Sequence, residues 1–304
     1  MTLRYSFLIL TITIIGGCKT YEEAKLAKQY FPQGKFISLL NHQVFVIEKN
    51  SQNSHLTPIV FIHGFSSNVH TWELIFSDTQ LSNPMVAIDL LGFGFSDKPN
   101  ITYDRKLYVD QIHSLLEFYH FDKVILVGNS MGGEISLRYT LNHPEKVSKL
   151  VLICSAGLIE GFDAPKIIKY PMVVLLRSTN FLFRNRYSIK FFLSDAFYDK
   201  TKVDKRKIDL YTLPLRTKNG YEAHIGLFLS SYQPISLDSL QKIQIPVLII
   251  WGEHDRWIPL EHAYLFYQNL PRAQLVILPE VGHLPQEEDP GVVIFYLKEF
   301  INSK

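Results

Sequence analysis

Several signatures are missing from this 304-residue chain, and each absence removes a class of protein. The chain has only two cysteines, too few for a disulfide framework or a cysteine-based zinc site. Basic and acidic residues nearly cancel, leaving a formal net charge of +2, so the charge gives no reason to expect a nucleic-acid partner. The sequence contains neither Gly-x-x-x-x-Gly-Lys-Ser/Thr nor His-Glu-x-x-His, the phosphate-loop and zinc-helix patterns. We therefore expect no metal and no cofactor.

What is present favours one large folded domain. Hydrophobic residues make up 47% of the chain and charged residues 20%, which is enough apolar material for a sizeable core. Cys154 ends the apolar run 150–154, where we expect a buried, unreactive thiol.

The N-terminus is typical of an exported protein. Arg4 precedes an apolar stretch over 7–15, which is short for a membrane span, and Gly16-Gly17-Cys18 follows. This resembles a bacterial lipobox, which predicts a signal peptide over 1–17, a lipidated Cys18 and a tether over 18–35. The expected location is then a membrane surface on the outer-membrane or periplasmic side. An ordinary signal peptide or an uncleaved anchor is the alternative.

Short apolar runs alternate with helix-length amphipathic segments, the pattern of a mostly parallel twisted sheet with helices on both faces. We predict strands over 43–48, 58–63, 85–90, 123–128, 149–154, 246–251 and 274–278, and helices over 103–118, 131–142, 260–269 and 291–301. The fold class is therefore α/β, with a core formed by 36–157 and 237–304.

The alternation stops over 158–236, where aromatic and basic residues are interleaved. An insertion of this length inside a doubly wound sheet is most simply a helical cap over the strand ends, where such sheets bind ligands. Its aromatic side chains are explained by packing within the cap as well as by a lipid-facing surface.

The strongest functional signal is Gly128-Asn129-Ser130-Met131-Gly132, placed between a predicted strand and a predicted helix. A serine on that sharp turn has an exposed Oγ, and the flanking glycines allow close packing. Ser130 is therefore the predicted nucleophile. The alternative is a purely structural role, in which Ser130 caps the N-terminus of the helix.

A serine nucleophile needs a histidine base, and the base needs an orienting carboxylate. Glu253 and Asp255 both lie on the loop after the strand 246–251. His283 lies on the loop after the strand 274–278, a position that none of the other ten histidines shares. Chain order serine, acid, histidine is the order that a Gly-x-Ser-x-Gly elbow of this type requires.

Taken together, the motifs resemble those of the α/β-hydrolase superfamily, over nearly all of the chain from residue 43 except the cap. The matching pieces are His63-Gly64-Phe65, Asp89-Leu-Leu-Gly-Phe-Gly-Phe-Ser96, Gly128-Asn-Ser-Met-Gly132, Trp251-Gly-Glu-His-Asp255 and Gly282-His283. The resemblance implies a triad of Ser130, Asp255 and His283, with Glu253 as a minor alternative for the acid.

The resemblance also implies an oxyanion hole made by the backbone N–H groups of Phe65 and Met131. His63, Gly64, Gly128 and Gly132 then support the two loops that carry these groups. The side chains of Phe65 and Met131 are expected to line an apolar substrate pocket.

These inferences predict a serine hydrolase that cleaves esters of apolar acyl chains, an esterase or lipase acting on a small-molecule or lipid ester. The exported N-terminus favours this function over its nearest alternative, a carbon–carbon hydrolase of the meta-cleavage-product type with the same triad. A remote alternative is an inactive scaffold that uses its cap for binding. The oligomeric state is not readable from the sequence.

Overall fold

The computed structural model describes residues 23–158, 171–172, 174–175, 178–179, 182 and 184–303. The predicted signal peptide over 1–17 and Cys18 lie outside the described residues. None of the helices in the described part is both long and apolar enough to cross a membrane.

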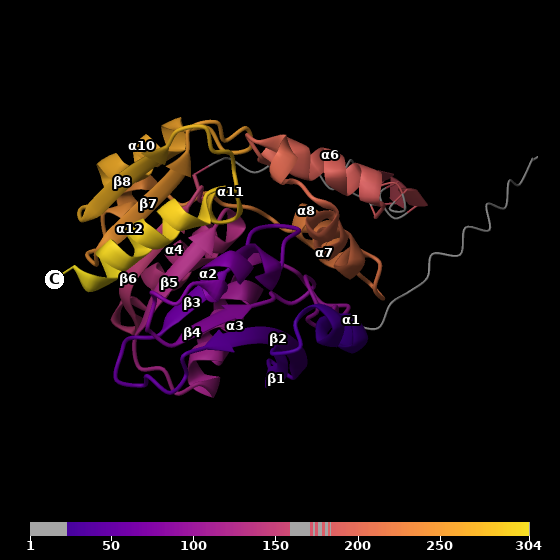
Figure 1. The fold of residues 1–304 in the computed structure, drawn as a ribbon, viewed down its shortest axis with the longest axis horizontal. Coiled ribbons are helices and arrows are strands. Elements are labelled where there is room, and N and C mark those ends of the chain that lie inside the picture. Colours follow the sequence, from indigo (N-terminus) through magenta and orange to yellow (C-terminus); the bar gives the residue numbers. More distant parts are fainter. Residues whose placement is uncertain are drawn as a thin grey trace, which may run out of the picture.

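The fold is centred on an eight-stranded sheet with the order β1-β2-β4-β3-β5-β6-β7-β8 (Figure 1). β1 and β2 pair antiparallel, as do β2 and β4, and all other pairs are parallel. The strands are β1 (Lys35–Leu39), β2 (His42–Lys49), β3 (Ile59–Ile62), β4 (Met85–Ile88), β5 (Val124–Asn129), β6 (Val147–Ile153), β7 (Val247–Gly252) and β8 (Ala273–Leu278). All seven predicted strands are present, and the predicted α/β fold class is confirmed.

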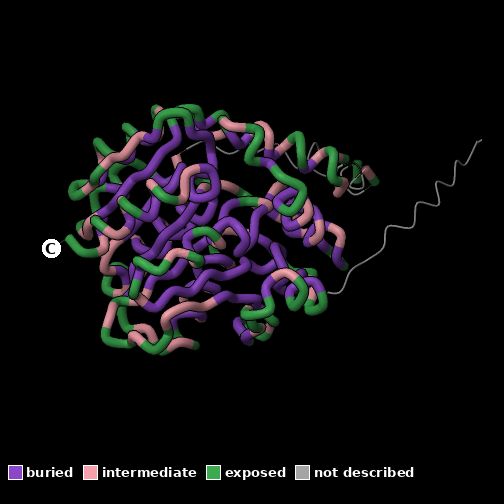
Figure 2. The backbone as a smooth tube through the Cα atoms, viewed as in Figure 1, coloured by how far each residue is buried: buried purple, intermediate pink, exposed green. Residues whose placement is uncertain are grey.

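Burial on both faces explains the nearly continuous apolar sequence of the central strands. Along β3, Val60 and Ile62 belong to one core cluster, whereas Ile59 and Phe61 belong to the other. This alternation follows from the two-residue period of a strand, and it makes the centre of the molecule buried throughout (Figure 2).

Helices cover both faces of the sheet. The core cluster on one face takes side chains from three of the predicted helices: α3 (Arg105–Phe118), α4 (Met131–Asn142) and α10 (Glu261–Asn269). The cluster on the other face takes side chains from α1 (Glu23–Tyr30), η1 (Val69–Trp72), α2 (Glu73–Ser77) and α12 (Pro290–Asn302), the fourth predicted helix. The short elements η2 (Pro144–Lys146), α9 (Leu237–Leu240) and α11 (Pro285–Glu288) complete this layer structure.

The edge strand β1 was not predicted from the sequence. It forms a hairpin with β2 through Leu40 and Asn41, which have φ values of 51° and 64°. Two consecutive positive φ values are typical of a type I′ turn, which usually contains Asn-Gly or Asp-Gly. Because leucine rarely adopts this conformation, the turn carries no recognisable sequence signal.

The prediction of a tether over 18–35 is wrong from Glu23 onward. Residues 23–30 form the helix α1, and Leu26 and Ala27 are buried in the core. Phe31 is only 1% exposed, with its ring 5.9 Å from that of Phe95. The segment folds because it supplies apolar side chains that cover one face of the sheet, despite its charged appearance.

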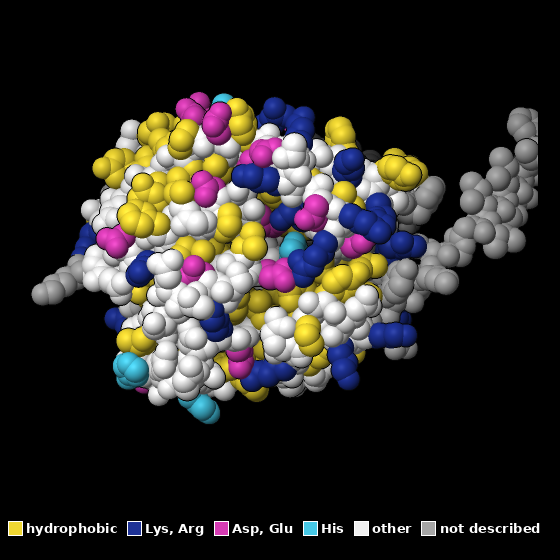
Figure 3. Space-filling view, in the orientation of Figure 1, with side chains coloured by type: hydrophobic (Ala, Val, Ile, Leu, Met, Phe, Trp, Pro, Cys, Tyr) yellow, Lys and Arg dark blue, Asp and Glu magenta, His cyan; other side chains and the backbone are white. Residues whose placement is uncertain are grey.

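The described part of 158–236 is helical and lies to one side of the sheet (Figure 1). It contains α6 (Arg186–Ala196), η4 (Lys200–Lys202), α7 (Lys205–Leu215) and α8 (Glu222–Leu229). Side chains of α6 and α7 form a small separate hydrophobic core. Leu284, the residue just before α11, also belongs to this core. On the outer surface, Lys and Arg side chains are interspersed with hydrophobic ones over the cap side of the molecule (Figure 3).

We predict that Phe31→Ala lowers the free energy of unfolding by about 3 kcal/mol, because it leaves a cavity beneath α1. Urea denaturation measures the change. The matched control is Phe118→Ala, since Phe118 is 45% exposed. A loss below about 1 kcal/mol would mean that this segment behaves as a tether after all.

Candidate active site

Ser130 lies on a strained turn between β5 and α4. Its φ and ψ are 55° and −118°, a conformation that residues other than glycine rarely adopt. The turn is held by the Ser130 N–H, which donates to Ile153 O at 3.0 Å. A Cβ on Gly128 would lie 2.3 Å from Gly132 O, and one on Gly132 would lie 2.1 Å from Ile62 O. Only glycine at both positions permits this packing.

The structure brings Asp255 and His283 together. His283 Nδ1 and Asp255 Oδ2 are 2.7 Å apart, and both side chains are buried. The other carboxylate oxygen, Oδ1, accepts the N–H groups of Trp257 at 2.8 Å and Ile258 at 3.0 Å. Because the loop fixes one oxygen, the second is aimed at the imidazole, and Nε2 is left for the nucleophile.

Glu253, the alternative acid, points elsewhere. Its side chain is half exposed and lies 3.9 Å from His254 Nε2. His254 in turn stacks on Tyr198 of the cap with ring centroids 4.5 Å apart. The neighbouring residue Asp255 is thus the carboxylate that contacts His283.

The cap holds the loop of His283 through its backbone. The His283 N–H donates to Ala196 O, the last residue of α6, at 2.7 Å. Next to it, the Gly282 N–H donates to Glu288 Oε2 at 2.8 Å, and Glu288 also accepts the N–H groups of Tyr198 and Asp199. A buried carboxylate on α11 therefore joins the end of α6 to the histidine loop.

Asn129 ties the serine turn to the histidine loop. Its Nδ2 donates to Ile153 O at 3.1 Å and to His283 O at 3.2 Å. The position before the serine is variable in the Gly-x-Ser-x-Gly pattern, so no sequence signal marks this role of Asn129.

His63 connects the loop after β3 to the end of β4. Its Nε2 accepts the N–H of Leu90 at 3.0 Å, and its Nδ1 lies 2.7 Å from Gly64 O. An acceptor at Nε2 places the proton on Nδ1, which donates to Gly64 O. Burial lowers the pKa of His63 to about 4. The side chain is therefore a neutral clamp that fixes the His63-Gly64-Phe65 loop.

That loop packs directly against Ser130. A Cβ built on Gly64 would lie 3.1 Å from Ser130 Cβ, so the backbone that leads to Phe65 passes beside the serine. Met131 is the first residue of α4, and its N–H has no acceptor within the helix. Both backbone groups predicted to form the oxyanion hole thus adjoin Ser130.

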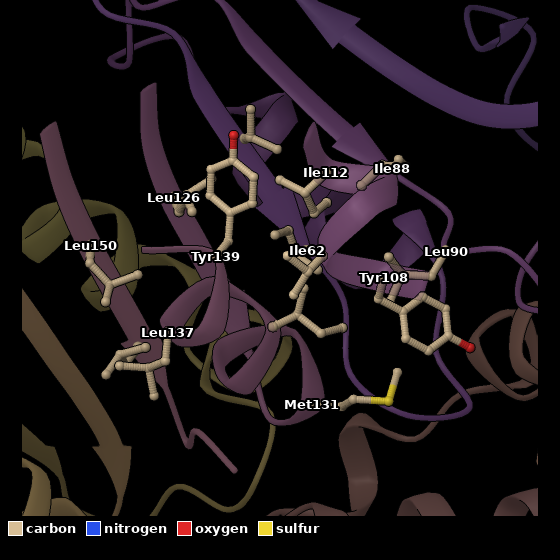
Figure 4. Close-up of a cluster of buried hydrophobic side chains, with 14 of the residues drawn as sticks. Ile62, Ile88, Leu90, Tyr108, Ile112, Leu126, Met131, Leu137, Tyr139 and Leu150 are labelled. Atoms are coloured by element: carbon tan, nitrogen blue, oxygen red, sulfur yellow. The ribbon is translucent and has the colours of Figure 1, made fainter. Parts of the chain in front are cut away.

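The expectation that Met131 lines the pocket is wrong. Its side chain is 4% exposed and belongs to the core cluster with Ile62 and Tyr108 (Figure 4). The side chain therefore lies in the core with residues of β3 and α3, and it is not among the residues that line the cavity beside Ser130. Phe65 does line the pocket and is 41% exposed.

A cavity of about 130 Å³ adjoins Ser130 and His283. Core and cap both contribute to its wall, which is mainly apolar. The lining residues are Gly64, Phe65, Ser67, Asn129, Ser130, Phe192, Leu193, Tyr211, Trp257, His283 and Leu284. The cap positions in this set were not singled out by the sequence, because no motif marks them. A larger groove of about 500 Å³ lies elsewhere, beside the opposite ends of β3 and β4.

Cys154 follows β6 and is buried beside the acid, as expected for a thiol in this apolar run. Its Sγ lies within 4.8 Å of ligand atoms of Asp255 and His283. Burial raises the pKa of the thiol well above its usual value. The thiol therefore packs beside Asp255, the carboxylate that contacts His283.

A serine, a histidine and a carboxylate at the carboxyl ends of β5, β8 and β7 define a serine hydrolase. A sequence model of the alpha/beta hydrolase fold family matches residues 57–290. The chain therefore belongs to the alpha/beta hydrolase family.

Relatives support this assignment. The chain is 29% identical over 259 residues to YugF, an uncharacterized hydrolase of Bacillus subtilis, covering 85% of this chain and 94% of YugF. It is 30% identical over 249 residues to a 2-hydroxy-6-oxo-6-(2'-aminophenyl)hexa-2,4-dienoic acid hydrolase of Metapseudomonas resinovorans, covering 77% of this chain and 80% of the relative.

Solved structures with the same fold include two kinds of enzyme. A serine hydrolase involved in carbazole degradation has a TM-score of 0.74 at 24% identity, covering 88% of this chain and 98% of its own. A bacterial membrane phospholipase A has a TM-score of 0.69 at 22% identity, covering 92% and 90%. At these identities the likeness establishes the fold alone.

The lowered pKa of His63 makes stability depend on pH. Because the pKa of His63 falls from 6.5 in the unfolded chain to about 4 in the folded one, its full contribution to stability is present above pH 6.5. That contribution is lost progressively as the pH falls from 6.5 to about 4. We predict that the free energy of unfolding of His63→Gln falls less between pH 7 and pH 4.5 than that of the wild type, by about 2 kcal/mol. The amide of glutamine can replace both hydrogen bonds and does not titrate.

Urea denaturation at both pH values measures this difference. His55→Gln is the matched control, because His55 is exposed. If the two variants have the same pH dependence, His63 is not the neutral clamp described above.

Proposed function

We propose that the protein hydrolyses its substrate through an acyl-enzyme on Ser130. His283 takes the proton of Ser130 Oγ as the oxygen attacks a carbonyl carbon, and the N–H groups of Phe65 and Met131 stabilise the oxyanion. The bond to the leaving group then breaks, and His283 returns the proton to that group. Water activated by His283 releases the acyl part. The observation that carries this proposal is the 2.7 Å contact between His283 and Asp255 beside the strained Ser130.

The first substrate class that we propose is a vinylogous diketone acid, cleaved at a carbon–carbon bond. The relative from Metapseudomonas resinovorans is named as a hydrolase of such a compound, and one from Pseudomonas as a hydrolase of the related 2-hydroxymuconate semialdehyde. The two matches cover 77% and 76% of this chain. In this reaction the enol form first takes a proton on the carbon next to the attacked carbonyl and becomes the diketone. The leaving group then departs as a delocalised enolate, which takes its proton from His283.

A carboxylic ester with an apolar acyl chain is the second candidate. One feature of the site favours it: no lysine or arginine is among the described residues that line the cavity. The substrates named for the relatives are acids, and a buried carboxylate requires a cation or several donors. An ester of an apolar acid requires neither.

We predict that the wild type turns over 2-hydroxy-6-oxo-6-phenylhexa-2,4-dienoate faster than p-nitrophenyl butyrate. Ser130→Ala lowers kcat/KM for both by about 10⁴-fold or more, because it removes the nucleophile. Absorbance assays follow both reactions. Ser77→Ala is the matched control, since Ser77 is on the outer helix α2.

Turnover of the p-nitrophenyl esters alone would replace the first substrate class with the second. A Ser130→Ala variant with full activity would overturn the acyl-enzyme mechanism itself.

We also propose that Cys18 anchors the protein to a membrane surface after export. Only residues 19–22 separate Cys18 from α1. Four extended residues reach at most about 14 Å, so such an anchor would hold the folded domain against the lipid surface. The support is the Gly-Gly-Cys sequence after an apolar segment.

We predict that radiolabelled palmitate is incorporated into the wild type in a bacterial host and that Cys18→Ser abolishes the label. Cys154→Ser is the matched control, because Cys154 is buried. Equal labelling of the wild type and Cys18→Ser would contradict the anchor.

A further inference from the structure

The cavity beside Ser130 has a polar wall formed by Ser67 and Tyr211. Ser67 follows the loop of Phe65, and Tyr211 comes from the cap helix α7. Ser67 Oγ donates to the Tyr211 hydroxyl at 3.3 Å, and both residues line the cavity. They place a hydrogen-bonding position in a mainly apolar cavity.

The Tyr211 hydroxyl donates to Glu287 Oε1 at 2.5 Å. Glu287 is buried on α11, and its second oxygen accepts Lys207 Nζ at 2.5 Å. Although burial alone raises the pKa of Glu287, Lys207 and His70 beside it bring that pKa below its usual value. The carboxylate is therefore ionised and accepts the proton of Tyr211.

The direction of these hydrogen bonds fixes what the polar wall offers to a ligand. The Tyr211 hydroxyl donates its only proton to Glu287, and the Ser67 hydroxyl donates its only proton to the Tyr211 oxygen. Thr71, which itself accepts Gln286 Nε2 at 2.8 Å, also hydrogen-bonds to Tyr211. The tyrosine oxygen is thus saturated, and within this polar wall the free lone pairs belong to Ser67 Oγ.

We propose that Ser67 is a specificity-determining residue that accepts a hydrogen bond from a hydroxyl group of the substrate. The chain Ser67, Tyr211, Glu287 holds the serine proton away from the cavity, so the spot favours a donor over a carboxylate or ketone oxygen. A hydroxyl of this kind occurs on a polyol ester and on the enol of a vinylogous diketone acid. The inference rests on the proposed function, because it places the hydroxyl in the cavity of Ser130.

The test uses alkyl fluorophosphonates in matched pairs, with and without a terminal hydroxyl, on chains of three, four and five carbons. Intact-protein mass spectrometry gives the labelling rate of Ser130 in the full-length wild type, in Ser67→Ala and in Ser77→Ala as the control. In the wild type, we expect the hydroxylated probe of at least one pair to react about five- to tenfold faster than its partner. In Ser67→Ala that ratio falls to about one, whereas Ser77→Ala keeps it.

The rate of the unhydroxylated probe monitors the fold and the triad, so a misfolded variant is recognised by loss of both rates. A preference that survives in Ser67→Ala, or equal rates within every pair in the wild type, overturns the hydroxyl site and leaves the proposed function intact. Absence of any labelling of wild-type Ser130 overturns the proposed function as well.

Two ester pairs locate the hydroxyl. Comparing propyl butyrate with glyceryl butyrate tests the leaving group, and comparing ethyl butyrate with ethyl 4-hydroxybutyrate tests the acyl part. A Ser67-dependent preference in either pair supports the site.

Discussion

The close packing of backbone at the turn between β5 and α4 is the constraint on which the site depends. Ser130 adopts its strained conformation because Gly128 and Gly132 let α4 approach β3 and β5 without a side chain between them. The same approach starts α4 beside the nucleophile, so one N–H predicted for the oxyanion hole comes with the turn. The other comes from a loop that His63 fixes from within the core.

Besides covering one side of the sheet, the cap holds the loop of His283 in place. The His283 N–H is bonded to the end of α6, and Glu288 gathers N–H groups from the cap and from Gly282. Glu287, the next residue, accepts hydrogen bonds from Tyr211 and Lys207 of α7. The short helix α11 therefore links the cap to the histidine loop, because its two glutamates bond to α7, to the segment after α6 and to Gly282.

Most of the core was predictable because its signals are local. Apolar runs of strand length and the Gly-x-Ser-x-Gly turn depend on neighbouring residues, so β5, α4 and Ser130 follow from the sequence. The prediction failed where the signal was weak or misleading. The β1–β2 turn was not predicted because it contains Leu40, a residue that is unusual in such turns. The helix before Phe31 was not predicted because its segment is rich in charged residues.

The fold class, the turn that carries Ser130, and the loops that carry Asp255 and His283 follow from the residue pattern alone, because chain order and strand ends limit where these residues can lie. Three features became visible only in the folded chain: Asp255 Oδ2 faces the imidazole, Met131 packs in the core, and Ser67 bonds to Tyr211 at the cavity wall. These are contacts between residues distant in sequence. They depend on side-chain direction and cap placement, which no local pattern encodes.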